Sequence, residues 1–179
     1  MVCGGEYQSQ QESFHELIMA FLTGLALIFL TSLFYTNQFS LAVGLTACSL
    51  IPPIVGLVGL VLSGTPLDVS SFSGLISVTG IAVANSFMAI GAIESHPEFN
   101  SNFKAAVREG MQSRVRPILM TNLAAMAGFI PIAMGLAEGD EILRPFSIAI
   151  IVGLFGAMFT TLYMMPIFYS VMGRQNYQK

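Results

Sequence analysis

Long uncharged segments alternate with short polar segments along the chain. From residue 17 to residue 67 there is no Asp, Glu, Lys, Arg or His, and this stretch is long enough for two bilayer crossings of about 20 residues each. We place five such apolar segments at residues 17–35, 39–63, 69–93, 117–137 and 146–172. The pattern predicts an all-α fold, a polytopic membrane helix bundle with five transmembrane helices.

The polar segments divide the chain further. Residues 1–16 form a polar lead-in without Lys or Arg, and residues 174–179 form a polar tail. Residues 94–116 are the longest polar connection, and in it apolar side chains recur every four residues, at Phe103, Val107, Met111 and Val115. This spacing predicts one amphipathic helix lying in the membrane interface. We favour an ordinary connecting helix over a lipid sensor.

Prolines mark two places where a helix is expected to begin or bend. Pro117 follows the basic residues Arg114 and Arg116. A proline is tolerated in the first turn because its missing N–H would have no partner there, so the fourth membrane helix is expected to begin at Pro117. Pro52 and Pro53 lie in the middle of the second segment, which predicts a kinked helix.

Small side chains follow helical spacing in the third segment. In lipid, such a stripe allows a second helix to approach closely, so we assign helix packing to Ser73, Ser77, Gly80, Ala84 and Gly91. Gly153 and Gly156 offer close-packing positions in the fifth segment. Asn85 and Ser86 lie beside the stripe, and we favour an interhelical hydrogen bond there, worth about 0.6–2 kcal/mol. Part of an ion relay or a water path is the alternative.

Composition agrees with a membrane protein. Hydrophobic residues make up 54% of the chain and charged residues 9%, whereas roughly a quarter of residues are charged in soluble domains. The net charge is −3 and the seven Lys and Arg residues form no patch for nucleic acid. His15 and His96 border different segments, so we propose neither a metal site nor a cofactor. Ser86 has no neighbouring base, which argues against an intramembrane enzyme.

The basic residues predict an orientation. If residues 94–116 are cytoplasmic, that side of the membrane holds six of the seven basic residues, and Arg144 alone lies outside. Cytoplasmic loops of membrane proteins carry an excess of Lys and Arg. Because five crossings place the chain ends on opposite sides, we expect an external N-terminus and a cytoplasmic C-terminus.

Several motifs, taken in order, carry a resemblance to a known family. They are GIAVANS at 80–86, RVRPILMT at 114–121, GFIP at 128–131, GDEILRP at 139–145 and PIFY at 166–169. In their order and spacing the chain resembles the C-terminal membrane half of a resistance-nodulation-division (RND) efflux permease of the AcrB/AcrD/AcrF-like family. The resemblance covers nearly the whole chain and implies helices eight to twelve of the family plan.

The resemblance implies a proton-driven exporter of drugs or other small molecules in the bacterial inner membrane. The complete pump is expected to be a trimer that works with a periplasmic adaptor protein, and the N-terminus of this chain is expected on the periplasmic side. Asn85, Arg114 and Thr121 match positions that support the proton relay. Ala84 stands where many drug exporters carry a lysine.

The family's proton-accepting acidic pair belongs to the other half of the permease. No Asp or Glu lies deep in a predicted segment here, so we expect a truncated or split fragment that is inactive alone. Its partners would be membrane lipid and either the N-terminal half of an RND permease or a full-length permease. The alternative is a small structural or regulatory membrane protein that binds a partner permease.

Overall fold

Helices account for all the regular structure in the computed structural model, which describes residues 3–97, 99, 102–136 and 140–172. The elements are α1 (Cys3–Thr36), α2 (Phe39–Ser49), α3 (Ile51–Leu62), α4 (Val69–Glu94), α5 (Phe103–Ala133), α6 (Asp140–Phe159), the short π-helix η1 (Thr160–Met164) and α7 (Met165–Met172). α2 and α3 together make one crossing, and so do α6, η1 and α7. The predicted all-α bundle with five membrane-length helices is confirmed.

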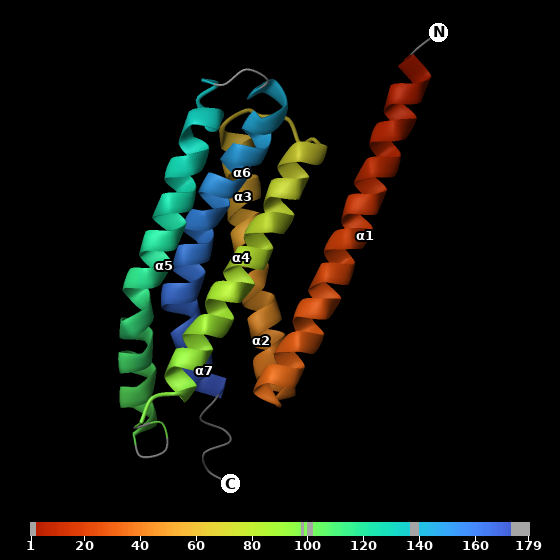
Figure 1. The fold of residues 1–179 in the computed structure, drawn as a ribbon. Helices are drawn as coiled ribbons and strands as arrows, with labels where there is room; N and C mark the ends of the chain where they lie inside the picture. Colours follow the sequence, from red (N-terminus) through yellow and green to blue (C-terminus); the bar gives the residue numbers. More distant parts are fainter. Residues whose placement is uncertain (1–2, 98, 100–101, 137–139, 173–179) are drawn as a thin grey trace.

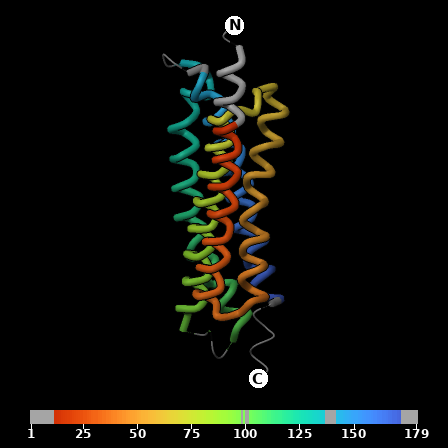
Figure 2. Tube along the Cα trace, turned by 90° about the vertical axis from the view of Figure 1, so that its right-hand side faces the viewer, coloured from red at the N-terminus to blue at the C-terminus, as the bar shows by residue number. Residues whose placement is uncertain are grey.

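The helices run along one common axis, as both views show (Figure 1, Figure 2). α6 packs against α3, α4 and α5, and these four helices stand together in Figure 1. α1 lies on one side of them, close at the end where α2 begins and leaning away at the end where α1 begins. The start of α1 and the end of α7 lie at opposite ends of the bundle (Figure 1), as an odd number of crossings requires.

Short connections fix where α2 and α4 begin. Asn37, between α1 and α2, has a φ of 52°, a left-handed conformation that asparagine tolerates better than most residues. Asp68 caps α4: its Oδ1 accepts a hydrogen bond from the Ser71 N–H at 2.7 Å, and Ser71 Oγ accepts one from the Asp68 N–H at 2.9 Å. This reciprocal pair satisfies two N–H groups at the helix start.

Glycines line the contact that α6 makes with α3 and α4. A Cβ atom added to Gly153 would lie 2.8 Å from the Val78 side chain, and one added to Gly74 would lie 2.9 Å from the Phe146 carbonyl oxygen. We call four of the close-packed glycines the glycine seam: Gly56, Gly74, Gly153 and Gly156. Small residues let membrane helices approach closely, where lipid provides no hydrophobic force between them. The close packing predicted at Gly153 and Gly156 is confirmed.

α5 corrects the prediction for residues 94–116. It runs without a break through Pro117, so the amphipathic stretch and the fourth crossing are a single helix rather than two. Val107 and Met111, in the first part of α5, are buried in a cluster shared with α2, α4 and α7. Such tertiary contacts override the local preference of proline for a first turn, and membrane helices accommodate interior prolines. A separate interfacial helix and a helix start at Pro117 are therefore not observed.

The second crossing breaks where a kink was predicted. α2 ends at Ser49 and α3 begins at Ile51, with Pro52 and Pro53 in the first turn of α3. A proline in that position leaves no helical hydrogen bond unmade. Leu50, the one residue between α2 and α3, keeps a helical conformation (φ −82°, ψ −17°), so the interruption lies within one crossing at the place where the kink was predicted.

The outer borders of the other crossings also differ from the prediction. α1 begins at Cys3, inside the predicted lead-in of residues 1–16, although its membrane-length apolar part covers Glu12–Thr36. α6 begins at Asp140, six residues before residue 146, and contains Pro145. α5 ends at Ala133, four residues before the predicted end of the fourth crossing at residue 137, and the predicted tail at 174–179 lies outside the described residues.

Candidate functional site

A hydrogen bond between two buried amides joins α4 to α5. Asn85 Nδ2 donates to Asn122 Oδ1 at 3.4 Å, and the two residues are 5% and 2% exposed. This is the interhelical hydrogen bond that we favoured for Asn85. At 3.4 Å the bond is longer than the usual 2.7–3.2 Å for N–H···O. Asn122 Nδ2 is buried and has no partner among the described residues.

Thr161, on the last crossing, is another buried polar residue, and it lies at about the same depth as Asn85. The hydrogen bond between Tyr169 and Glu94 gives the reference level for this comparison. Tyr169 Oη donates to Glu94 Oε1 at 3.0 Å and ties α7 to the end of α4. Asn85 is nine residues before Glu94, and Thr161 is eight residues before Tyr169. At about 1.5 Å per residue, Asn85 therefore lies about 13 Å along its helix from the bond between Tyr169 and Glu94, and Thr161 about 12 Å. α4 also contacts η1, the element that carries Thr161. We call Asn85, Asn122 and Thr161 the buried polar layer.

Two donors in this layer lack partners. The Thr161 hydroxyl is fully buried and, like Asn122 Nδ2, makes no hydrogen bond within the described part of the chain. The neighbouring hydroxyls differ, because Ser86 Oγ donates to the Ala82 carbonyl at 2.9 Å and Thr160 Oγ1 to the Gly156 carbonyl at 2.8 Å. Unpaired buried polar groups are rare and costly in proteins. The layer therefore has spare capacity to bind a further polar group such as water.

Thr121 and Arg114 lie outside this layer. Thr121 is exposed, and its hydroxyl donates to the Pro117 carbonyl at 3.0 Å and the Ile118 carbonyl at 3.2 Å within its own helix. Arg114 is half-buried and has no ion-pair partner among the described residues. The structure thus brings Asn85 together with Asn122 rather than with Thr121.

The predicted small-residue stripe on α4 points away from the glycine seam. Ser77, Gly80 and Ala84 are exposed, whereas Ser73 and Gly91 are half-buried. A Cβ atom added to Gly80 would meet nothing within 4 Å, and one on Gly91 would meet only the hydroxyl of Tyr35, at 3.1 Å. We call Ser77, Gly80 and Ala84 the outer face of α4. Packing of this face against another helix stays a prediction.

Sequence reasoning missed Asn122 and Thr161 as site residues. Each was visible as a polar residue in a long apolar segment, and the adjacent pair Thr160–Thr161 was a further signal. Which of the neighbours Thr121 and Asn122 turns inward was not readable, because both faces of a membrane helix can be apolar. The burial of Asn122 settles this point.

The chemistry of the buried polar layer is limited to hydrogen bonding. Amides and threonine hydroxyls donate and accept hydrogen bonds but do not ionise at physiological pH. Three acidic side chains that the structure describes lie within or beside the last four crossings: Asp68 caps the start of α4, Glu94 accepts the Tyr169 hydroxyl at its end, and Glu109 of α5 pairs with His96. No group of three His, Cys, Asp or Glu in the described residues is arranged to hold a metal ion. The unpaired donors of the layer can bind water, but the layer contains no acid that could take up a proton.

Known proteins are similar to this chain in fold and in sequence. The crystal structure of a heavy metal efflux pump superposes with a TM-score of 0.78 at 28% sequence identity, over 94% of this chain and 16% of the pump. The nickel and cobalt resistance protein CnrA of Cupriavidus metallidurans is 34% identical over 165 residues, which is 91% of this chain and 15% of that protein. The cobalt-zinc-cadmium resistance protein CzcA of the same organism is 30% identical over 178 residues, 98% of this chain and 17% of that protein.

These matches agree on one family. The chain spans about one sixth of the length of each of these proteins. The model of the AcrB/AcrD/AcrF family matches residues 1–173, almost the entire chain. The motifs at 80–86 and 114–121, which carried the resemblance, lie on α4 and α5 around the buried polar layer. This chain belongs to the AcrB/AcrD/AcrF family of RND efflux permeases.

Proposed function

We propose that this chain is the C-terminal membrane portion of a proton-driven RND efflux permease and that it acts only together with the rest of such a permease. One observation carries the proposal. The buried bond between Asn85 and Asn122 lies directly beside two exposed residues, Ala84 and Thr121. Polar groups suited to a relay therefore adjoin a surface that this chain leaves uncovered.

The missing part of the relay is an acid. A proton-coupled transporter needs a group that takes up and releases a proton inside the membrane, and amides and hydroxyls cannot do this. The half-buried Arg114, on the same helix as Asn122, has no carboxylate partner among the described residues. An acidic residue supplied across the uncovered surface would find a cation and several hydrogen-bonding groups there. Asn85, Arg114 and Thr121 would then support its proton exchange.

Heavy-metal cations are the cargo that we propose, whereas the family resemblance implied drugs or other small molecules. Two relatives that cover more than nine tenths of this chain are nickel, cobalt, zinc and cadmium resistance proteins, and the similar solved structure is a heavy metal efflux pump. The rest of the permease would bind and move the metal. The complete pump would be a trimer in the bacterial inner membrane and would work with an adaptor protein. In this chain the relay residues would supply energy coupling rather than metal ligands.

A complementation experiment tests the coupling role. A metal-sensitive bacterium would express a heavy-metal permease in which this chain replaces the corresponding membrane segment, and nickel and cobalt tolerance and cell-associated metal would be measured. We expect tolerance to be restored, and Arg114→Ala or Thr121→Ala to abolish it at equal membrane abundance. Arg116→Ala and Thr31→Ala are matched controls, since both residues are exposed. Tolerance unaffected by Arg114→Ala and Thr121→Ala would contradict the relay role.

A second experiment tests whether the chain needs the remaining helices. The purified chain alone in proteoliposomes should move neither protons nor metal down an imposed gradient. Transport by the chain alone, lost on Arg114→Ala, would refute the proposal that it works only as part of a larger permease.

The exposed outer face of α4 favours a competing function, a small membrane protein that binds and regulates a permease. Gly80→Leu would then abolish co-purification with a full-length permease while that permease still exports metal. Gly128→Leu is the matched control, because a Cβ atom at either glycine meets nothing within 4 Å. If Gly80→Leu abolished both co-purification and metal export, the result would favour the coupling role instead.

A further inference from the structure

A pocket of about 450 Å³ lies between the first part of α5 and α7, at the end of the bundle where the chain ends. Among the described residues, its lining comes from two helices: Lys104, Val107, Arg108, Met111, Gln112 and Val115 from α5, and Pro166 and Ser170 from α7. This end of the bundle is the one that the distribution of Lys and Arg predicts to be cytoplasmic. None of the lining residues belongs to the buried polar layer.

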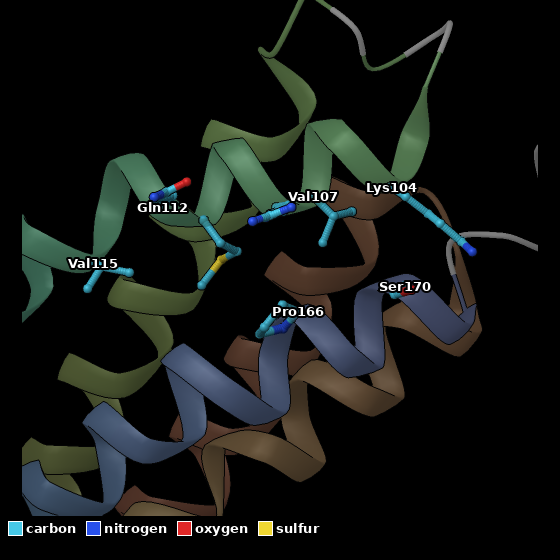
Figure 3. A pocket seen from close by; sticks show the side chains of 8 residues that line it. Lys104, Val107, Gln112, Val115, Pro166 and Ser170 are labelled. Carbon is cyan, nitrogen blue, oxygen red and sulfur yellow. The ribbon is translucent and has the colours of Figure 1, made fainter.

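The pocket changes character along its length. Figure 3 shows Lys104 and Ser170 at one end, Val107 and Pro166 in the middle, and Gln112 and Val115 at the other end, so the labelled charged side chain lies at the first end. Lys104 and Val115 are eleven residues apart, so at about 1.5 Å per residue the pocket follows the helix for some 16 Å. That is close to half of the roughly 30 Å hydrocarbon core of a bilayer. A molecule with a polar head and an apolar tail matches this gradient.

The charges at the polar end are unbalanced. Lys104 and Arg108 are both exposed, and neither has a carboxylate within ion-pair distance among the described residues. The nearby acidic groups are engaged elsewhere: Glu109 pairs with His96 at 3.1 Å, and Glu94 accepts the Tyr169 hydroxyl. Two cations therefore face the mouth of the pocket without a compensating anion among the side chains that the structure describes.

We propose that this pocket binds an anionic phospholipid, with the phosphate at Lys104 and Arg108 and an acyl chain along Met111, Val115 and Pro166. Basic pockets between membrane helices on the cytoplasmic side are suited to acidic lipid head groups. The long side chains of Lys and Arg reach such a phosphate while their methylene groups cover apolar surface. A zwitterionic lipid brings its own cation and so gains less from this site. The site is independent of the proposed proton coupling.

Lipid titration of the purified full-length chain tests the proposal. Native mass spectrometry in a neutral detergent would give apparent dissociation constants for phosphatidylglycerol and phosphatidylcholine. We expect the chain to prefer phosphatidylglycerol, and Lys104→Gln/Arg108→Gln to weaken its binding by about tenfold to thirtyfold, since each cation near a lipid surface adds about a fivefold factor. Phosphatidylcholine binding should stay the same.

A matched variant separates a built site from general charge attraction. Arg116→Gln/Arg144→Gln removes two positive charges from exposed residues outside the pocket lining, and it should change phosphatidylglycerol binding by less than twofold. An equal loss in both double variants, or equal affinity for the two lipids in the unmodified chain, would overturn the proposal. Circular dichroism checks that each variant keeps its helix content. If the double variant misfolds, each single substitution should still weaken binding about fivefold.

A competition arm distinguishes a lipid from a free phosphate. Inorganic phosphate at millimolar concentration should leave bound phosphatidylglycerol in place, because the acyl chain contributes contacts that phosphate lacks. Displacement by inorganic phosphate would show a simple anion site and contradict the lipid assignment.

Discussion

α1 and α6 are both apolar enough to cross a membrane, yet they differ in what surrounds them. In the membrane-length window of α1 only 6% of residues are buried, against 50% in the crossing that contains α6. α1 exposes large side chains such as Leu22 and Phe34, whereas α6 brings Gly153 and Gly156 into the glycine seam. Hydropathy therefore identifies a crossing, and small residues decide where the chain packs on itself.

Enlarging a seam glycine should give the largest difference between the two helices. Gly153→Leu would place atoms where Val78 already lies, and overpacking costs about 1–3 kcal/mol or more. Gly24→Leu in α1 is the matched variant, because nothing lies within 4 Å of its added Cβ. The measurement is the midpoint of thermal unfolding in detergent. Unfolding is monitored by the reaction of the buried Cys48 with a thiol-reactive dye, in a Cys3→Ser background. Equal shifts for both glycines would remove the distinction.

Breaking the amide pair should have the next largest effect. Asn122→Leu removes the acceptor of the Asn85 bond and leaves that buried amide without its partner, which should lower the free energy of unfolding by about 1–2 kcal/mol. Thr31→Val in α1, where the exposed hydroxyl bonds only to its own helix, should cost less than about 0.5 kcal/mol. Adding Asn85→Leu to Asn122→Leu should recover part of the loss, and strict additivity would argue against a real pair.

The tie between α7 and α4 should contribute a smaller amount. Tyr169→Phe removes the hydroxyl that donates to Glu94 at 3.0 Å and should cost about 0.5–1.5 kcal/mol. The exposed Tyr163 offers a comparison with the same chemical change, and Tyr163→Phe should leave the unfolding temperature unchanged. A larger effect at Tyr163 would mean that the Tyr169 bond does not hold the helices together.

The smallest expected effect on stability is at Thr161. Its hydroxyl is buried without a partner among the described residues, so Thr161→Val should be neutral or slightly stabilising in the isolated chain. In the metal-tolerance assay of the complete permease, the same substitution should lower export if the hydroxyl holds water in the relay. A loss of more than about 1 kcal/mol in the isolated chain would instead indicate an unrecognised hydrogen bond.

The sequence was sufficient for the crossings because each contains a long apolar run. The turn at Asn37 and the cap at Asp68 follow from local chemistry as well, since asparagine accepts a positive φ and an aspartate accepts N–H groups at a helix start. The inward position of Asn85 agrees with its being a polar residue in a membrane span. These features depend on residues close together in the chain.

Features that depend on distant residues were predicted less well. Pro117 was expected to start a helix, but burial of Val107 and Met111 keeps α5 continuous through it. On α4 the stripe with Gly80 and the opposite stripe with Gly74 both have small residues, and only the position of α6 decides which one is buried. In lipid both faces of a helix can be apolar, so hydrophobic periodicity does not distinguish them.

The glycine seam also limits which substitutions this protein can accept during evolution. Every replacement of a glycine adds atoms, and at Gly56, Gly74, Gly153 and Gly156 the added atoms meet a neighbouring helix at about 3 Å or less. A single substitution at one of these glycines is therefore expected to need a compensating substitution on the facing helix. The exposed positions of α1 have no such constraint from the other helices of this chain and can vary among apolar residues. Among homologues of this chain, we therefore expect the sequence of α1 to diverge most, and substitutions in α3, α4 and α6 to be correlated.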